Sequence, residues 1–301
     1  MSAVRARLPD GRVHFQHGPI DLLIGVDAEP AVAAAAIERA WRRFVPLLDE
    51  LVAELPRLRC CAEPDAPPSG SVAARMHAAV LPFRPRFVTP MAAVAGAVAD
   101  EIVGCLRGPG IVRAWVNNGG DIALHLAEGA ADYAIGVALD RAGDRRAAPR
   151  RIALPAVLRL PADAPWRGVA TSGWRGRSLS LGIADSVTVL AADGARADAA
   201  ATMIANAVDV DAPGIRRAPA ASLRDDSDLG ERLATVEVPP LPDEAVRRAL
   251  EAGAAEARRC VGRGLVGGAL IALQGRWRVV GDAVARAGEV DARARRRPIA
   301  A

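Results

Sequence analysis

Hydrophobic positions in the first part of the chain follow two periods, one typical of strands and one typical of helices. Alternation of apolar and polar residues predicts an opening hairpin, with strands over Val13–Gln16 and Ile20–Val26. Apolar residues at helical spacing then predict three helices, from Pro30 to about Leu55, over Ser71–Val80 and from Pro90 to Cys105. We expect Pro46 to kink or divide the first helix, because proline lacks the N–H that a helix interior needs.

After Gly110 the pattern changes to short apolar runs separated by Gly, Asp or Pro. These runs predict strands over Ile111–Val116, Ile122–Leu126, Tyr133–Leu139, Ile152–Leu160, Gly168–Thr171 and Ser186–Ala191. Helical spacing returns over Ala197–Val208, and the polar stretch 209–228 is typical of a loop. The remaining predicted elements are a strand over Ala234–Val238, a helix from Pro242 to Gly262 and a hairpin around Gln274-Gly275.

This order of elements predicts an α+β fold. Helices and strands alternate irregularly, without the regular rhythm of a doubly wound parallel sheet, which favours mixed or antiparallel sheets packed with helices. Neither an internal repeat nor a clean linker divides the sequence. We therefore expect a single compact domain over residues 1–281, followed by an Arg-rich tail over 282–301 that is disordered.

The composition is that of a soluble globular protein, with 51% hydrophobic and 25% charged residues. No run of about eighteen apolar residues occurs, and the first residues form no apolar leader, so we expect a cytoplasmic protein without a membrane partner. The net charge of +4 is spread along the chain and only 3% of residues are aromatic, which argues against binding of nucleic acid. The four cysteines lack the spacing of a metal site.

Two segments place small residues beside polar ones at predicted chain reversals. Thr89 is expected to cap the helix that starts at Pro90, and the Ala- and Gly-rich sequence up to Gly96 lets a ligand or another backbone approach closely. A helix N-terminus also offers free N–H groups to an anion, although tight helix packing explains the same small residues. The second segment, Asn117-Asn118-Gly119-Gly120-Asp121, is predicted to be a hairpin turn whose polar side chains could face a ligand.

The run Gly168–Gly182 combines four glycines and three serines with Arg175 and Arg177. Backbone N–H groups, serine hydroxyls and guanidinium donors together suit a phosphate or another anion. The run lacks the spacing of a P-loop, because the chain contains no lysine. A surface loop without a ligand is the alternative that the sequence leaves open.

Asp198, Thr202 and Asn206 follow one another at four-residue steps, which stacks them along one face of the predicted helix. A carboxylate and a hydroxyl one turn apart can both bind a hard cation, and Mg²⁺ prefers such oxygen ligands. The alternative is that Asp198 only stabilises the helix N-terminus and the other two face solvent. Because the rest of this helix is nearly all alanine, we favour a metal site at Asp198 and Thr202.

Together these segments resemble a known family. In order along the chain, Thr-Pro-Met-Ala-Ala-Val-Ala-Gly (89–96), Asn-Gly-Gly-Asp-Ile (118–122), Thr-Ser-Gly (171–173), Ala-Asp-Ser-Val-Thr-Val (184–189) and Ala-Asp-Ala-Ala-Ala-Thr-Met-Ile-Ala-Asn (197–206) are similar to the uncharacterised branch of the ApbE-like superfamily. The founding members of that superfamily are flavin transferases, which move FMN from FAD onto a protein threonine using Mg²⁺. The resemblance thus implies an ApbE-like fold, Mg²⁺ and FAD or FMN as cofactors, and possible homo-oligomers.

The resemblance also assigns roles to residues. It implies that Asp198 and Thr202 hold the metal, with a backbone carbonyl from Ala92–Ala95 completing the site. The residues implied to bind the flavin nucleotide are Gly119, Gly120, Asp121, Thr171, Ser172 and Gly173, with Trp174 stacking on a planar ring; Ser178 and Ser180 join them as candidate phosphate ligands.

One departure from the transferases bears on the reaction. Their Thr-Ser-Gly is followed by a His-x-x-Asp-Pro segment, whereas this chain has Arg177-Ser-Leu-Ser-Leu-Gly182, which counts against flavin transfer itself. We therefore expect a Mg²⁺-dependent enzyme, a transferase or phosphoester hydrolase, acting on a flavin, nucleotide or other phosphorylated small molecule. A ligand-binding module without catalysis and a structural partner in an assembly are the alternatives, and no catalytic residue is assigned.

Overall fold

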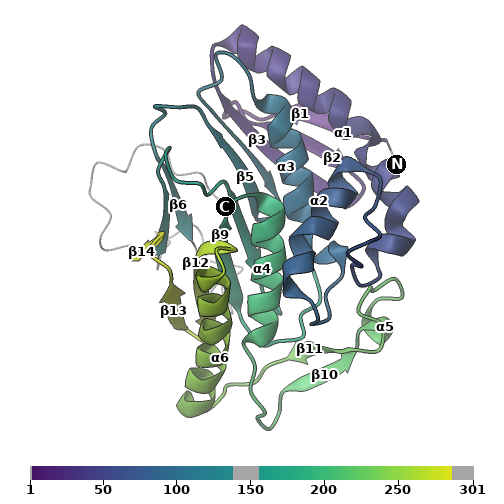
Figure 1. Cartoon of the computed structure of the whole chain (residues 1–301), viewed down its shortest axis with the longest axis vertical. Coiled ribbons are helices and arrows are strands. Elements are labelled where there is room, and N and C mark those ends of the chain that lie inside the picture. The colour runs from purple at the N-terminus through teal and green to yellow at the C-terminus, as the bar shows by residue number, and fades with distance from the viewer. Residues whose placement is uncertain (1, 138–155, 287–301) are drawn as a thin grey trace. The chain divides into compact units, whose positions relative to one another are not determined.

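The computed structural model describes residues 2–137 and 156–286 (Figure 1). Contacts within the chain divide it into two compact units whose segments alternate along the sequence. The first unit combines Met1–Ala131, Ala162–Ala170 and Ala191–Ala200. The described part of the second combines residues 132–137, 156–161, 171–190 and 201–286. The boundaries fall inside three elements, which therefore contribute residues to both units: β8 (Gly168–Ser172), β9 (Ser186–Ala191) and α4 (Gly194–Ala207).

The strands of the first unit pair in the order β1-β2-β3-β4-β5-β8, and every neighbouring pair is antiparallel. The strands before β8 are β1 (Val4–Arg7), β2 (Val13–His17), β3 (Ile20–Asp27), β4 (Arg113–Asn118) and β5 (Asp121–Leu126). The predicted opening hairpin is β2-β3, and its alternating residues, such as Phe15 and Leu22, are fully buried. The sequence did not predict β1, which is short and exposed at every residue.

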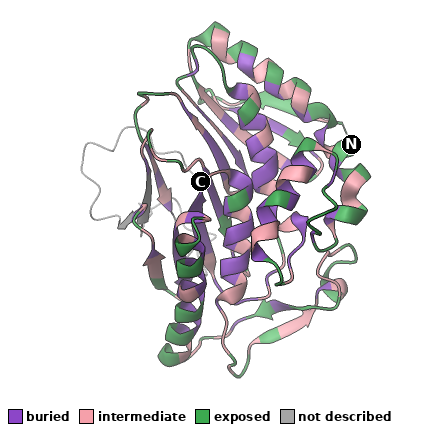
Figure 2. Cartoon of the chain, viewed as in Figure 1, coloured by how far each residue is buried: buried purple, intermediate pink, exposed green. Residues whose placement is uncertain are grey.

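The helices of the first unit are α1 (Pro30–Leu58), α2 (Ser71–Val80) and α3 (Val94–Leu106), with 3-10 turns at Leu81–Phe83 and Pro90–Ala93. Pro46 lies inside α1 and does not divide it; the flanking Phe44 and Leu47 are fully buried, so packing holds the helix across the missing hydrogen bond. The central helix is α3, which contacts α1, α2, β4 and β5 and is buried along most of its length (Figure 2).

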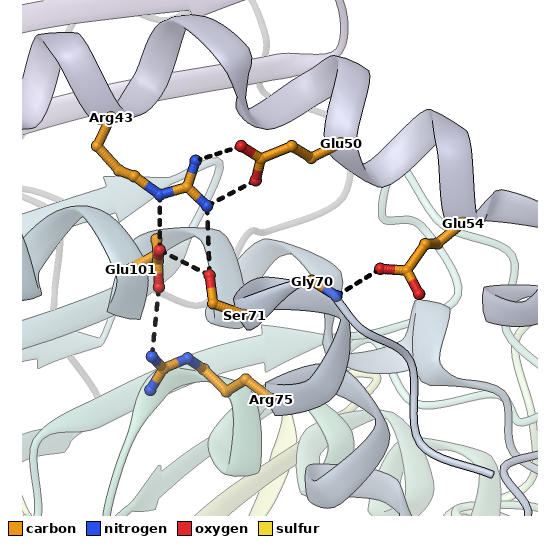
Figure 3. A network of polar contacts seen from close by, with 7 residues as sticks. All are labelled: Arg43, Glu50, Glu54, Gly70, Ser71, Arg75 and Glu101. Atoms are coloured by element: carbon orange, nitrogen blue, oxygen red, sulfur yellow. Dashed lines mark hydrogen bonds and ion pairs between the residues drawn. The ribbon is translucent and has the colours of Figure 1, made fainter.

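A polar network joins α1, α2 and α3 (Figure 3). The Arg43 guanidinium binds Glu50 through two hydrogen bonds of 3.0 and 2.7 Å and donates a third, from Nε, to Glu101 Oε1 at 2.7 Å. Glu101 also accepts the Ser71 hydroxyl at 2.8 Å and lies 3.4 Å from an Arg75 nitrogen. These contacts hold the pKa of Glu101 below its usual value despite its burial. The network therefore fixes one side of α3.

In the second unit the strand order is β8-β9-β12-β13, where β12 (Val266–Leu273) and β13 (Arg276–Val280) form the predicted final hairpin. Helix α6 (Asp243–Gly262) contacts both of its strands. A separate antiparallel sheet has the order β14-β7-β6, formed by β6 (Tyr133–Val137), β7 (Ala156–Leu160) and β14 (Val284–Arg286). The last elements are β10 (Arg216–Pro219), α5 (Ala220–Leu223) and β11 (Leu233–Glu237).

The structure confirms the α+β class, with helices packed on antiparallel strands. Two further expectations change in the second unit. The stretch 209–228 was expected to be loop, yet it contains β10, paired with β11, and the short helix α5. Residues 284–286, which the sequence placed in the tail, form β14 instead. The rest of the tail, from residue 287 onward, lies outside the described residues. The same holds for residues 138, 139 and 152–155 of the predicted strands. Among the described helices, none is long and apolar enough to cross a membrane.

Candidate functional site

The Asp198 carboxylate lies at the start of α3. Its Oδ2 accepts the Gly96 N–H at 3.1 Å, while Ala93, the residue that precedes α3, makes no side-chain capping bond. The predicted cap was Thr89, but its side chain makes no capping bond to the 3-10 turn that follows, and α3 begins only at Val94. The sequence suggested that free N–H groups at this helix start could bind an anion. In the structure the Asp198 carboxylate of α4 caps the start of α3 instead.

The start of α4 is capped from α3 in return. Asp100 is buried, and its two carboxylate oxygens accept the N–H groups of Gly194 and Ala195, each at 2.8 Å. The backbones touch beside these bonds: a Cβ added to Gly96 would lie 2.1 Å from the Gly194 carbonyl oxygen. Gly96 therefore serves tight helix packing, one of the two explanations that the sequence left open for the segment 89–96. Burial, and then the charge of Asp193, raise the pKa of Asp100 to about 6.

The hairpin turn between β4 and β5 lies against the same helix start. Gly119 and Gly120 have φ values of +65° and +116°, which side chains other than glycine rarely adopt, and the Gly120 N–H donates to Asn117 Oδ1 at 2.7 Å. The neighbouring Asn118 donates its side-chain amide to the Ala95 carbonyl at 3.1 Å. This contact links the polar turn to Ala92–Ala95, the segment from which the resemblance implies a backbone carbonyl ligand for the metal.

Two carboxylates interact at this place. The pKa of Asp198 is raised well above its usual value, first by burial and then by the charge of Asp121, the first residue of β5. Asp100 adds a smaller repulsion, whereas the N–H groups of Gly96 and Ala95 favour the ionised form. The structure thus brings together Asp121, Asp198 and the Ala92–Gly96 segment within the first unit, which the sequence had placed in one site.

The remaining metal candidate, Thr202, is half-buried on α4, one turn after Asp198. Among the described residues, no group of three His, Cys, Asp or Glu side chains could hold a metal ion. A cation at Asp198 would therefore need hydroxyl, backbone carbonyl or water oxygens beside the carboxylates, which is the ligand mixture that Mg²⁺ accepts. The donor atoms present fit such an ion.

The candidate residues of the second unit have their own partners. Thr171 is exposed, and its hydroxyl lies 2.9 Å from that of Thr188 on β9. Ser178 is exposed, whereas Ser180 is buried with its hydroxyl near the Gly182 carbonyl at 3.4 Å and Asn206 Oδ1 at 3.3 Å. The four-residue spacing placed Asn206 on the same helix face as Asp198. In the structure its side-chain oxygen instead accepts hydrogen bonds from Ser180 and Leu181.

The half-buried Trp174 is held from two sides. Its indole N–H donates to Asp185 Oδ1 at 3.3 Å, and the Arg175 guanidinium lies 4.8 Å from the ring centre. Asp185 Oδ2 in turn accepts the backbone N–H of Gln274 at 2.5 Å. Sequence reasoning did not single out Asp185 for this role, although it lies in one of the motifs that carry the resemblance.

Close packing explains several glycines of the run Gly168–Gly182. A Cβ on Gly168, Gly173 or Gly182 would lie 1.9, 2.3 or 2.1 Å from a backbone carbonyl oxygen of Asp193, Asp185 or Ala205, respectively. These positions exclude any side chain, whether or not a ligand is bound. Asp100 is the contact of the first unit that sequence reasoning missed; its signal was a carboxylate within an apolar helix run, beside the buried Val98, Ala99 and Ile102.

A family model described as "AbpE bacteria" matches residues 5–279. The chain belongs to this ApbE-like family. Among curated proteins, a UPF0280 protein of Methanosphaerula palustris is 36% identical over 65% of this chain and 77% of its own length. A UPF0280 protein of Methanopyrus kandleri is 34% identical over 64% of this chain and 72% of its own. These matches confirm the resemblance that the sequence motifs indicated.

Solved structures of ApbE proteins are more distantly similar to this ApbE-like chain. The apo flavinyl transferase ApbE of Pseudomonas stutzeri is 14% identical, with a TM-score of 0.38 over 93% of this chain and 94% of that one. The flavin transferase ApbE of Vibrio cholerae is also 14% identical, with a TM-score of 0.34 over 93% and 98% of the two chains.

Proposed function

We propose that this ApbE-like protein binds a divalent cation at Asp198 and acts on a flavin, nucleotide or other phosphorylated small molecule. The interaction between Asp121 and Asp198 carries the proposal. Burial, and then repulsion by the Asp121 carboxylate, raise the pKa of Asp198. A divalent cation between them would replace this repulsion by attraction, so the pair is suited to hold one.

The candidate ligands are all oxygen atoms. They are the carboxylates of Asp198 and Asp121, the hydroxyl of Thr202 one turn along α4, and a carbonyl of the Ala92–Ala95 segment. Hard oxygen donors of this kind favour Mg²⁺ over softer metals. When bound, Mg²⁺ supplies polarisation of a phosphoryl oxygen. Asn118, through its bond to the Ala95 carbonyl, orients the segment that would offer this ligand.

In the second unit, we propose that the segment 171–180 binds a phosphate group and that Trp174 stacks on a planar ring. Exposed Thr171 and Ser178 hydroxyls and the Arg175 guanidinium are donors that suit a phosphate. FAD and FMN contain both chemical parts. The His-bearing segment of the flavin transferases is missing after Gly173, so a phosphoester hydrolase or another transferase is the activity we favour.

A binding protein without catalysis is the second candidate. Asp121 and Asp198 are the acidic groups at the proposed cation site, and both are assigned to the ion, which leaves general acid–base chemistry without an assigned group. Such a protein would hold its ligand unchanged.

The ligand carried through purification tests both candidates. Mass spectrometry and visible absorbance of the purified protein identify it, and yellow colour would indicate a flavin. Turnover of that compound with and without Mg²⁺ then separates an enzyme from a binding protein. A protein that carries no ligand and binds no flavin, nucleotide or other phosphorylated small molecule would refute the proposal and favour a structural role in an assembly.

The cation assignment has its own test. Isothermal titration with Mg²⁺ compares the full-length protein with Asp198→Asn and with Asp49→Asn, a matched change at an exposed carboxylate on α1. We expect Asp198→Asn to lose binding at least tenfold while Asp49→Asn binds as the wild type does. Equal affinity in all three proteins would mean that the metal site is assigned wrongly.

A further inference from the structure

Each of the helices α3 and α4 provides the carboxylate that caps the other. Asp198 of α4 accepts the Gly96 N–H of α3, and Asp100 of α3 accepts the Gly194 and Ala195 N–H groups of α4. We propose that Asp100 is a positioning residue for Asp198. It fixes the first turn of α4 on α3 and thereby sets the Asp198 carboxylate at the start of α3. This inference rests on the proposed function only where the cation is concerned.

The contact leaves α4 little freedom. A Cβ on Gly96 would lie 2.1 Å from the Gly194 carbonyl oxygen, and one on Gly168 of β8 would lie 1.9 Å from the Asp193 carbonyl oxygen. The turn that begins α4 is therefore enclosed by backbone from α3 and from β8. Within this enclosure, the two bonds to Asp100 are directional, and they fix the rotation of the first turn as well as its position.

Rotation of this turn decides where Asp198 lies. Asp198 lies four positions after Gly194, so the two lie within about 40° of each other around the helix axis and about 6 Å apart along it. The face of α4 that meets α3 at Gly194 therefore carries Asp198 one turn later. An aspartate side chain is too short to compensate if the turn lifts or rotates. The 3.1 Å bond between Asp198 Oδ2 and the Gly96 N–H then fails.

A carboxylate suits this role better than an amide. Asp100 Oδ1 accepts one N–H and Oδ2 accepts the other, each at 2.8 Å. An asparagine offers a single oxygen and would present its NH₂ to the second N–H. Asp100→Asn therefore keeps the shape and removes one of the two bonds, whereas Asp100→Ala removes both.

The neighbouring residue provides a matched control. Glu101 contacts Arg43, Ser71 and Arg75, which all lie on α1 or α2 (Figure 3). Glu101→Gln thus weakens the packing of α3 on its other side without removing a contact to α4. A loss that follows from general destabilisation of α3 would occur in both Asp100→Ala and Glu101→Gln.

Two measurements on the full-length protein test the positioning role. Amide hydrogen exchange of Gly96 without metal reports the bond to Asp198 directly, and electron paramagnetic resonance of Mn²⁺ reports cation affinity. After correction for global stability, we expect Asp100→Ala to speed exchange at Gly96 and to weaken Mn²⁺ binding, each about tenfold, with Asp100→Asn intermediate. Glu101→Gln should change neither by more than about twofold.

The outcomes separate the two proposals. Equal effects of Asp100→Ala and Glu101→Gln, or no change in Gly96 exchange in either Asp100 variant, overturn the positioning role. If Asp100→Ala does not fold, Asp100→Asn against Glu101→Gln decides in the same way. A wild-type protein that does not bind Mn²⁺ overturns the cation proposal alone, because exchange at Gly96 still tests whether Asp100 positions Asp198.

Discussion

The crossing of α3 and α4 at Gly96 makes a strong prediction for Gly96→Ala. Alanine is the better helix former by about 1 kcal/mol, so propensity alone would make this variant more stable. The added Cβ, however, would lie 2.1 Å from the Gly194 carbonyl oxygen and 2.4 Å from its carbonyl carbon. Both neighbours are backbone atoms and cannot rotate away. The two helices must therefore move apart by about 1 Å to reach normal contact.

Three hydrogen bonds join the helices at this crossing and limit such a movement. They are the bond from Gly96 to Asp198, at 3.1 Å, and the two from Gly194 and Ala195 to Asp100, at 2.8 Å. Overpacking costs about 1–3 kcal/mol, and each buried group left without its partner adds about 1–3 kcal/mol. If one bond is lost, and the gain in propensity is subtracted, the free energy of unfolding should fall by roughly 1–5 kcal/mol.

Gly104→Ala is the control, because Gly104 lies on the same helix and a Cβ there would meet no atom within 4 Å. This variant should gain up to about 1 kcal/mol. Urea unfolding of both variants, followed by circular dichroism, gives the two free energies. If Gly96→Ala were as stable as Gly104→Ala, the helices would not meet at Gly96 and the reciprocal capping would be wrong.

Three further predictions concern pH, strain and the cation. The pKa of Asp100 rises from 3.8 to about 6 on folding, so its stabilising contribution is full below about pH 4 and is lost as pH rises through 6. The stability difference between wild type and Asp100→Asn should therefore fall by roughly 3 kcal/mol over that range; a constant difference in urea unfolding would contradict the pKa shift. Gln274 has a φ of +46°, so Gln274→Gly should be about 1 kcal/mol more stable than Gln274→Ala, and the reverse order would argue against strain there. Mg²⁺ at about a hundred times its dissociation constant should stabilise the wild type by about 2.7 kcal/mol but not Asp198→Asn, as a thermal shift assay would show.

Local sequence patterns correctly predicted the helices and strands whose own residues carry a clear hydrophobic period. The hairpin β2-β3 follows from alternation, and α2 has the bounds that helical spacing predicted, Ser71–Val80. The polar stretch 209–228 concealed β10, because that strand of four residues has no buried face and its partner β11 lies further along the chain. Strands of this length depend on pairing more than on their own sequence.

The candidate site shows the same division. Asp198 and Asp121 could be selected from the sequence, because their spacing and neighbours matched a family motif. Their surroundings could not. Asp198 accepts the N–H of Gly96, 102 positions earlier in the chain, and Asp100 accepts that of Gly194, 94 positions later. No local sequence pattern can predict contacts between residues so far apart in the chain. For the same reason Thr89 was predicted as a helix cap, a role that a distant aspartate takes for α3.

The interleaving of the two units has a consequence for synthesis on the ribosome. Strand β5 ends at Leu126, but the strand that pairs with its open edge, β8, begins only at Gly168. The bonds by which Asp100 caps α4 can form only after Ala195 has been synthesised. During the intervening seconds of translation, the nascent chain exposes an unpaired edge strand beside an incomplete helix layer. Chaperone binding at β5 is therefore expected to peak on nascent chains in which β5 has left the ribosomal exit tunnel and β8 has not, and ribosome profiling of chaperone-bound nascent chains would detect it.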